Sequence, residues 1–229
     1  MKKYMLITVV LLMAITASQA QNIIGIRAGY SNSSAKIDAL QDLTIDRYTE
    51  SGFHFAAFTE IPLAPGLFFQ PELAFNRMGF GGREDIDIRL LGLDIPANAR
   101  ISTRVNYLQM PLQIKYYFGA ENARVQPFVH AGPTIAYATS AELQARARFL
   151  LDFNLLREEI NMSSDHVNRW EIGGMGGAGV NFNLPGAVNI NLGANYYHAF
   201  NNWLNDPLID ADIYNRGWQM YVGTTIAMN

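Results

Sequence analysis

The sequence predicts an all-β protein, an eight-stranded antiparallel up-and-down transmembrane β-barrel with long external loops. Apolar residues alternate with small or polar ones through eight segments, short and long connections alternate between these segments, and aromatic residues gather near the segment ends. Charged residues make up only 16% of the 229 residues and the mean hydropathy is +0.02. This balance is apolar for a soluble domain yet too polar for a helical membrane bundle, and it suits apolar positions spread along strands.

The N-terminus carries the features of a secretory signal. Lys2 and Lys3 form a short basic start, residues 6–15 are apolar, and the small residues Ser18 and Ala20 occupy the −3 and −1 positions of a cleavage site. The alternative is a membrane anchor, but the apolar run is shorter than the ~20 residues of a spanning helix. We expect residues 1–20 to be a signal peptide and residues 21–229 to be one barrel domain in the cell outer membrane.

Net charge and cysteine content exclude several functional classes. Removal of Lys2 and Lys3 with the peptide leaves 15 basic residues against 20 acidic ones, a net charge of −5, so the chain has no basic footprint for nucleic acid. The chain contains no cysteine, which excludes a disulfide scaffold, a thiolate metal site and a cysteine nucleophile.

Each predicted strand is a run of period-2 alternation, and most runs are close to the ~9–11 residues that a tilted strand needs to cross a bilayer. In chain order the strands are residues 23–30, 53–61, 67–76, 105–118, 125–137, 170–182, 187–200 and 218–228. The turn-forming links are residues 62–66, 119–124 and 183–186, and the long, charged links are 31–52, 77–104, 138–169 and 201–217. Short and long links alternate, as in barrels with short periplasmic turns and long external loops. Both termini are therefore expected on the periplasmic side.

One register of each strand is apolar, as a lipid-facing register must be. The clearest registers are Phe53, Phe55, Ala57 and Ile61 in the second strand, Leu108, Met110, Leu112, Ile114 and Tyr116 in the fourth, Val188, Ile190, Leu192, Ala194 and Tyr196 in the seventh, and Trp218, Met220, Val222, Thr224 and Ile226 in the eighth. The residues between them are polar or small. A soluble sandwich would bury the apolar register instead.

Aromatic residues near both ends of the strands predict two interfacial girdles. The external girdle is expected to contain Tyr30, Phe53, Phe75, Tyr107, Tyr137, Trp170, Phe200 and Trp218. Phe69, Tyr116, Phe118 and Phe182 lie near the periplasmic ends. A soluble lipocalin-like barrel would explain the alternation but gives no reason for two girdles.

The inward register collects four charges, Arg27, Glu60, Glu72 and Lys115, on four consecutive strands. Because an unpaired charge in a narrow lumen is costly, we interpret this cluster, with neighbouring glutamines, as a hydrogen-bonded plug. We expect Arg27 to pair with Glu60 and Glu72 with Lys115, with the exchanged pairing equally open. Side chains only just fill an eight-stranded barrel, so no wide channel is expected.

Several patterns could indicate chemistry, but each has a structural interpretation. Residues 174–179 match the dinucleotide motif G-x-G-x-x-G, yet no helix pattern follows, and glycines inside a strand let the wall bend or a large side chain cross the lumen. Glu60 and Glu72 could form an acid–base pair, but the two nearby cations favour the plug.

The histidines also fail to form a recognisable site. His54, His130, His166 and His198 are scattered singly, so their spacing assembles neither a metal site nor a Ser-His-Asp arrangement. His198, near the outer rim with Tyr197 and Trp203, is the one position at which a lipid-modifying activity would be sought, and we interpret it as an interface residue. We expect no enzyme, no metal and no cofactor.

Alternation continues into two of the long links, which predicts strands that continue above the membrane as hairpins. The loops 77–104 and 138–169 could cap the barrel mouth or pack on each other. They could also present a surface to an envelope protein, a glycan or lipopolysaccharide, because long loops on a rigid scaffold carry binding.

Four stretches resemble the PorT-like outer-membrane β-barrel family: residues 107–118, 127–133, 176–180 and 195–198. This family is named for a protein linked to secretion and gliding in some Gram-negative bacteria, and the resemblance implies the fold rather than an activity. We expect a non-enzymatic outer-membrane barrel, structural or partner-binding, with external hairpins and a plugged lumen. The alternatives are a lipid-modifying enzyme, a small pore or transport component, and a soluble lipid carrier.

Overall fold

The computed structural model describes residues 22–37, 46–90, 93–120, 123–148, 152–159, 168–201 and 213–227. The expected signal peptide, His166 and Trp203 lie outside these residues. Within them the strands are β1 (Ile23–Ile37), β2 (Asp46–Ala64), β3 (Leu67–Leu90), β4 (Leu93–Tyr117), β5 (Val125–Arg148), β6 (Asp152–Glu159), β7 (Trp170–Asn183), β8 (Val188–Ala199) and β9 (Ile213–Ala227). The described part of the chain contains no helix long and apolar enough to span a bilayer.

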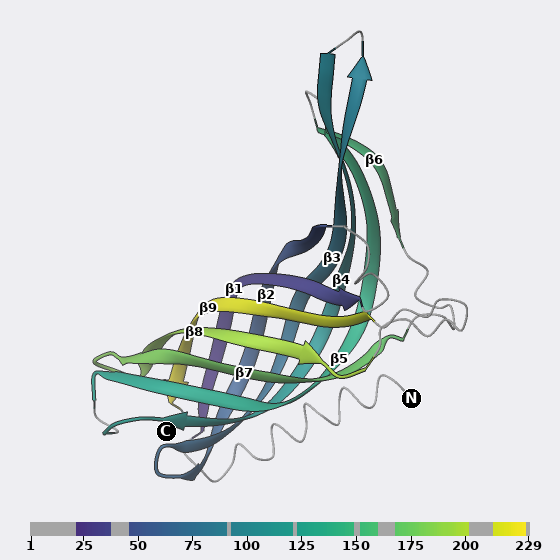
Figure 1. Cartoon of the computed structure of the whole chain (residues 1–229). Coiled ribbons are helices and arrows are strands. Elements are labelled where there is room, and N and C mark those ends of the chain that lie inside the picture. The colour runs from purple at the N-terminus through teal and green to yellow at the C-terminus, as the bar shows by residue number, and fades with distance from the viewer. Residues whose placement is uncertain are drawn as a thin grey trace.

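Eight of these strands close into an antiparallel barrel (Figure 1). Neighbours along the chain pair with each other, β5 pairs with β7, and β9 pairs with β1 to close the sheet. The strand β6 pairs with β5 alongside the barrel sheet. The predicted fold class, a closed eight-stranded antiparallel barrel, is confirmed.

Short turns join the strands at one end of the barrel, which we call the short-turn end. Each of its three turns contains a glycine with positive φ, namely Gly66 at 74°, Gly119 at 93° and Gly186 at 118°. Residues other than glycine rarely adopt this conformation, so these glycines allow the chain to reverse within a few residues. We call the opposite end the hairpin end.

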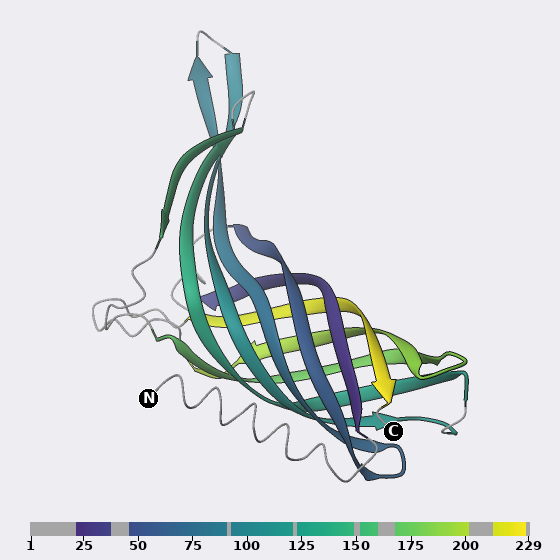
Figure 2. The same ribbon diagram turned by 180° about the vertical axis from the view of Figure 1, so that it is seen from behind.

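At the hairpin end β3, β4 and β5 continue well beyond the other strands and curve away from the barrel (Figures 1 and 2). The β3–β4 pairing runs from Leu67↔Tyr116 to Leu90↔Leu93, and β6 adds to the extended part of β5. We call this extension, residues 81–90, 93–104, 142–148 and 152–159, the arm. The predicted continuation of the two long links as strands is therefore correct.

The two faces of the wall differ sharply in polarity. On β9, Trp218, Met220 and Val222 are exposed on the outside at 59%, 67% and 53%, whereas Gln219 and Thr225 are buried at 3% and 2%. The same alternation runs through the other barrel strands, with polar side chains inside and apolar ones outside. Such an inverted polarity suits a wall surrounded by hydrocarbon.

Candidate functional site

The lumen is the candidate site because it gathers buried ionisable side chains from many strands. Arg27 on β1, Glu60 on β2, Glu72 on β3 and Lys115 on β4 all point inward and are at most 3% exposed. Each has an apolar, outward-facing neighbour in sequence, such as Ile26 beside Arg27 and Ile114 beside Lys115. Alternation along the strand therefore directs these charges to the inside.

The four charges form two tight ion pairs. The Arg27 Nη2 atom lies 2.7 Å from Glu72 Oε1, and the Lys115 Nζ atom lies 2.7 Å from Glu60 Oε1. The expected pairs Arg27–Glu60 and Glu72–Lys115 are wrong, and the exchanged pairing is the one that forms.

The strand register explains this exchange. Arg27 lies opposite Ala56, four residues from Glu60, and Lys115 lies opposite Phe68, four residues from Glu72. In the observed pairs the offset is two residues: Glu72 lies level with Phe58 and Gly25, two residues from Arg27. Two residues correspond to about 7 Å along a strand and four to about 13 Å, so the observed partners are closer along the strands, although each pair skips one strand and reaches across the lumen side of it.

Aromatic rings and hydroxyls complete the surroundings of the pair Lys115–Glu60. The Nζ atom of Lys115 lies 4.1 Å from the ring centroid of Phe128 and 4.7 Å from that of Tyr117. The Tyr117 hydroxyl is 3.0 Å from each carboxylate oxygen of Glu60 and donates to this group. The Lys115 ammonium is thus stabilised by the ion pair and by cation–π contacts, and the Glu60 carboxylate by the ion pair and the Tyr117 hydroxyl.

Amides and a further ring join the second pair to its surroundings. Gln70 Nε2 donates to Glu72 Oε2 at 3.3 Å and to Gln113 Oε1 at 3.2 Å. The Cζ atom of Arg27 lies 4.5 Å from the ring centroid of Tyr221. Arg27, Glu72 and the two glutamines therefore form one hydrogen-bonded network, and Lys115, Glu60 and Tyr117 form a second one.

A second buried carboxylate cluster lies toward the hairpin end and was not predicted. Glu171, which is 1% exposed, accepts hydrogen bonds from the Tyr197 hydroxyl at 2.6 Å, the Asn215 amide at 2.6 Å and the Tyr107 hydroxyl at 3.2 Å. The sequence contains the pattern that predicts this position, because Trp170 and Ile172 belong to the apolar, outward register and Glu171 stands between them. Alternation alone places its carboxylate in the lumen.

Tyr107 is the one predicted girdle residue that the structure removes from the outer wall. It is 0% exposed and reaches Glu171 across the lumen, because it precedes the outward-facing Leu108 and so belongs to the inward register. The other seven lie on the outside: Tyr30, Phe53, Phe75, Tyr137, Trp170, Phe200 and Trp218. Rings pack against each other there, as in Tyr137–Trp170 with centroids 4.9 Å apart.

Glycines in the wall face aromatic rings inside the lumen. A Cβ atom at Gly25 would lie 2.3 Å from Phe58, one at Gly179 2.4 Å from Phe128, and one at Gly193 2.5 Å from Tyr221. The glycine-rich residues 174–179 lie inside β7. The dinucleotide motif is therefore a piece of strand whose glycines leave room for side chains.

Metal-binding side chains do not gather in the described part of the chain. No group of three or more His, Asp or Glu side chains among these residues could hold a metal ion. His198 lies on the outer face, stacked with Tyr196 at a centroid distance of 6.5 Å, whereas Tyr197 points into the lumen. The wall thus separates the two residues that the sequence had placed together at the rim.

A comparison with protein families assigns the chain. Residues 19–205 match the family described as the outer membrane protein beta-barrel domain. The chain belongs to this family. It is therefore an outer-membrane β-barrel protein, and its outward apolar register faces lipid.

Solved structures with similar folds are distant in sequence. Neisserial surface protein A is 11% identical, with a TM-score of 0.46 over 90% of this chain and 97% of that one. OprG of Pseudomonas aeruginosa is 16% identical, with a TM-score of 0.44 over 93% of this chain and 99% of that one. The N-terminal barrel domain of OprF of Pseudomonas aeruginosa is 9% identical, with a TM-score of 0.42 over 91% and 98%. No curated protein matches the chain.

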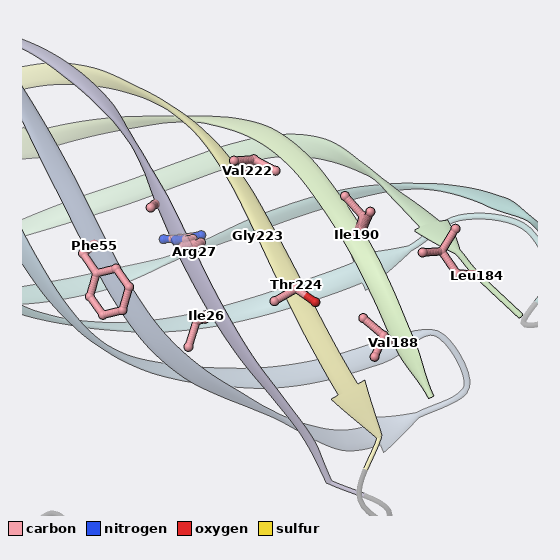
Figure 3. Close-up of a pocket in the computed structure, with 10 residues that line it drawn as sticks. Ile26, Arg27, Phe55, Leu184, Val188, Ile190, Val222, Gly223 and Thr224 are labelled. Atoms are coloured by element: carbon pink, nitrogen blue, oxygen red, sulfur yellow. The ribbon is translucent and has the colours of Figure 1, made fainter. Parts of the chain in front are cut away.

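The outer wall of this barrel protein carries an apolar hollow of about 420 Å³ (Figure 3). Ile26 on β1, Val222 on β9 and Ile190 on β8 line it, and Leu184 of a short turn closes one side. The hydroxyl of Thr224 in this hollow donates to the backbone oxygen of Asn189 at 3.1 Å. Apart from Arg27 and Thr224, the side chains that line this hollow are apolar.

Proposed function

We propose that this protein is a non-enzymatic outer-membrane barrel with a lumen closed by paired charges and an arm that binds partners. The observation that supports closure best is the pairing of Arg27 with Glu72 and Lys115 with Glu60 at 2.7 Å inside a narrow barrel. Paired, hydrogen-bonded charges are held in place, whereas a conducting path needs charges that solvent can reach.

Single-channel recording in planar bilayers tests the closed lumen. The refolded protein is expected to insert without discrete conductance steps, because the ion pairs, Gln70 and Gln113 occupy the lumen. The matched variant replaces all four charged residues with alanine and serves as a positive control for opening. Reproducible steps from the unmodified protein would show that it is a pore.

The arm is the proposed working surface. Its strands are joined by backbone pairing from Leu90↔Leu93 down to the barrel, which supports a binding role for the loops 77–104 and 138–169 to which they belong. We propose an envelope protein partner for these residues, and outer-leaflet lipid, including lipopolysaccharide, for the wall beside them.

Photo-crosslinking from the arm tests this assignment. A crosslinker at Asp87 in the arm is expected to capture a defined envelope protein, while one at Asn183 in a short turn is the matched control. Capture of the same proteins from both positions would contradict a dedicated arm surface. A shortened β3–β4 hairpin should lose the crosslink and keep the folded barrel.

Several narrower assignments belong to the same proposal. Residues 1–20 are proposed to be cleaved as a signal peptide before the barrel domain 21–229 inserts, with the hairpin end outside the cell. Within its family the chain is proposed to be PorT-like, on the stretches quoted from its sequence. N-terminal sequencing of the outer-membrane form tests the cleavage, with residue 21 expected first.

A further inference from the structure

Two arginines stand on the outer wall at the hairpin end, directly beside aromatic rings of the external girdle. The Cζ atom of Arg77 on β3 lies 5.2 Å from the ring centroid of Phe53. The Cζ atom of Arg169, just before β7, lies 4.7 Å from the ring centroid of Tyr137. A guanidinium that rests on a ring is oriented and partly desolvated, so it loses less freedom when it binds an anion.

Both guanidinium groups use one nitrogen to hold their place on the wall. Arg77 Nε donates to Asn106 Oδ1 at 2.9 Å, and Arg169 Nε donates to the backbone oxygen of Ala138 at 3.3 Å. Within the described part of the chain, the terminal Nη atoms of these two arginines have no hydrogen-bond partner and no carboxylate within ion-pair distance. Arg27, by contrast, is neutralised by Glu72.

Two polar side chains continue from Arg77 onto the neighbouring strands β4 and β5, and Arg169 is held beside the same strand β5. Arg77 lies opposite Asn106 of β4, and Asn106 lies opposite Ser140 of β5 and donates to its hydroxyl at 2.9 Å. The amide of Ala138 donates to the backbone oxygen of Arg169 at 2.8 Å, which brings Arg169 beside β5. Three strand spacings thus separate the arginine backbones by about 14 Å across the sheet, and Arg169 lies level with Ala138 rather than Ser140, which adds an offset along the strands. We call Arg77, Asn106, Ser140 and Arg169 the arginine shelf.

We propose that the arginine shelf binds the phosphate groups of an outer-leaflet glycolipid whose sugar headgroup carries two phosphates. Each guanidinium presents its free Nη donors to one phosphate, a geometry that favours charge-assisted hydrogen bonds. Asn106 and Ser140 between them offer an amide and a hydroxyl to the sugar. The girdle beside the shelf places it at the depth where headgroups meet hydrocarbon.

This inference rests on the proposed function, because it requires the hairpin end to lie in the outer leaflet. Orientation is tested separately by a single cysteine in the arm, Asp87→Cys, in a chain that has no other cysteine. Labelling of intact cells by a membrane-impermeant thiol reagent establishes the orientation. If the cysteine is not labelled, the orientation fails and the shelf is placed in the wrong leaflet.

Binding is measured on the refolded protein in neutral detergent micelles with bisphosphorylated lipid A, dephosphorylated lipid A and inorganic phosphate as probes. Arg77→Gln and Arg169→Gln are each expected to weaken binding of bisphosphorylated lipid A about tenfold, and the double variant about a hundredfold. Arg124→Gln is the matched control, since it removes the same charge from an exposed site at the short-turn end and should change the affinity less than twofold.

The three probes separate the sources of the phosphate. Preference of the unmodified protein for the bisphosphorylated lipid over the dephosphorylated one, lost in the double variant, supports the shelf. Equal affinity for both lipids, or an unchanged double variant, overturns it. Inorganic phosphate that binds at the same concentration as the lipid overturns the glycolipid assignment in favour of a free-anion site. The gel mobility of unboiled variants establishes that they still fold.

Discussion

Removal of one partner from the buried pair Lys115–Glu60 should destabilise the barrel strongly. In Lys115→Met the Glu60 carboxylate, 0% exposed, loses its cation and keeps the Tyr117 hydroxyl as its donor among the described residues. A buried charge left without its partner typically costs about 3–5 kcal/mol. The expected loss in free energy of unfolding is therefore about 3–5 kcal/mol, while Arg124→Met at the exposed turn should change it by less than about 0.5 kcal/mol.

The double variant Lys115→Met/Glu60→Met separates charge from packing. Because it removes both charges and leaves apolar side chains of similar length, it should recover most of the stability, with a coupling energy of about 3 kcal/mol. The assay is reversible urea unfolding in lipid vesicles, followed by tryptophan fluorescence and by gel mobility before boiling. A loss in free energy of unfolding below about 1 kcal/mol for Lys115→Met would refute a desolvated ion pair. So would a double variant whose loss equals the sum of the losses of the two single variants.

Three further perturbations test other parts of the barrel by the same unfolding assay. Glu171→Gln should lower the free energy of unfolding by about 1–3 kcal/mol, since an amide cannot accept hydrogen bonds from all three surrounding donors. An unchanged midpoint would mean that solvent already accepts hydrogen bonds from these donors. Gly193→Ala should lower the free energy of unfolding by about 1–3 kcal/mol, because its Cβ would lie 2.5 Å from Tyr221. Gly176→Ala should be tolerated, because the nearest atom to its Cβ would be 3.7 Å away, and equal losses for the two variants would contradict this packing. Val222→Arg, on the lipid face, should cost about 2–4 kcal/mol, and a neutral result would place that face in water.

The strand positions at the short-turn end were predictable from local sequence. Predicted and observed limits there agree within three residues, as for β1 at Ile23, β3 at Leu67 and β5 at Val125. Pro and Gly residues punctuate the alternation sharply at these turns. At the hairpin end β3 continues to Leu90 rather than residue 76, because pairing continues beyond the membrane wherever alternation and partner strands persist.

Side-chain partners inside the lumen were less predictable. The sequence places Arg27, Glu60, Glu72 and Lys115 on the inner face, but the stagger between strands decides which of them can meet. That stagger depends on how the whole sheet closes, so the sequence of a single strand does not predict it. Glu171 was not predicted, although it stands between the outward-facing Trp170 and Ile172 and alternation therefore directs it into the lumen.

The pairing of β1 with β9 constrains how the protein can assemble. These two strands share fifteen paired positions, from Ile23↔Ala227 to Ile37↔Ile213, although they stand at opposite ends of the barrel sequence. The sheet cannot close before the last strand has been synthesised, and until then β1 exposes unpaired backbone groups. The closed barrel therefore cannot form during translation. The chain must reach its membrane before the sheet has closed. Any truncation that removes β9 leaves β1 and β8 with unpaired edges, which quality-control proteases and chaperones can recognise.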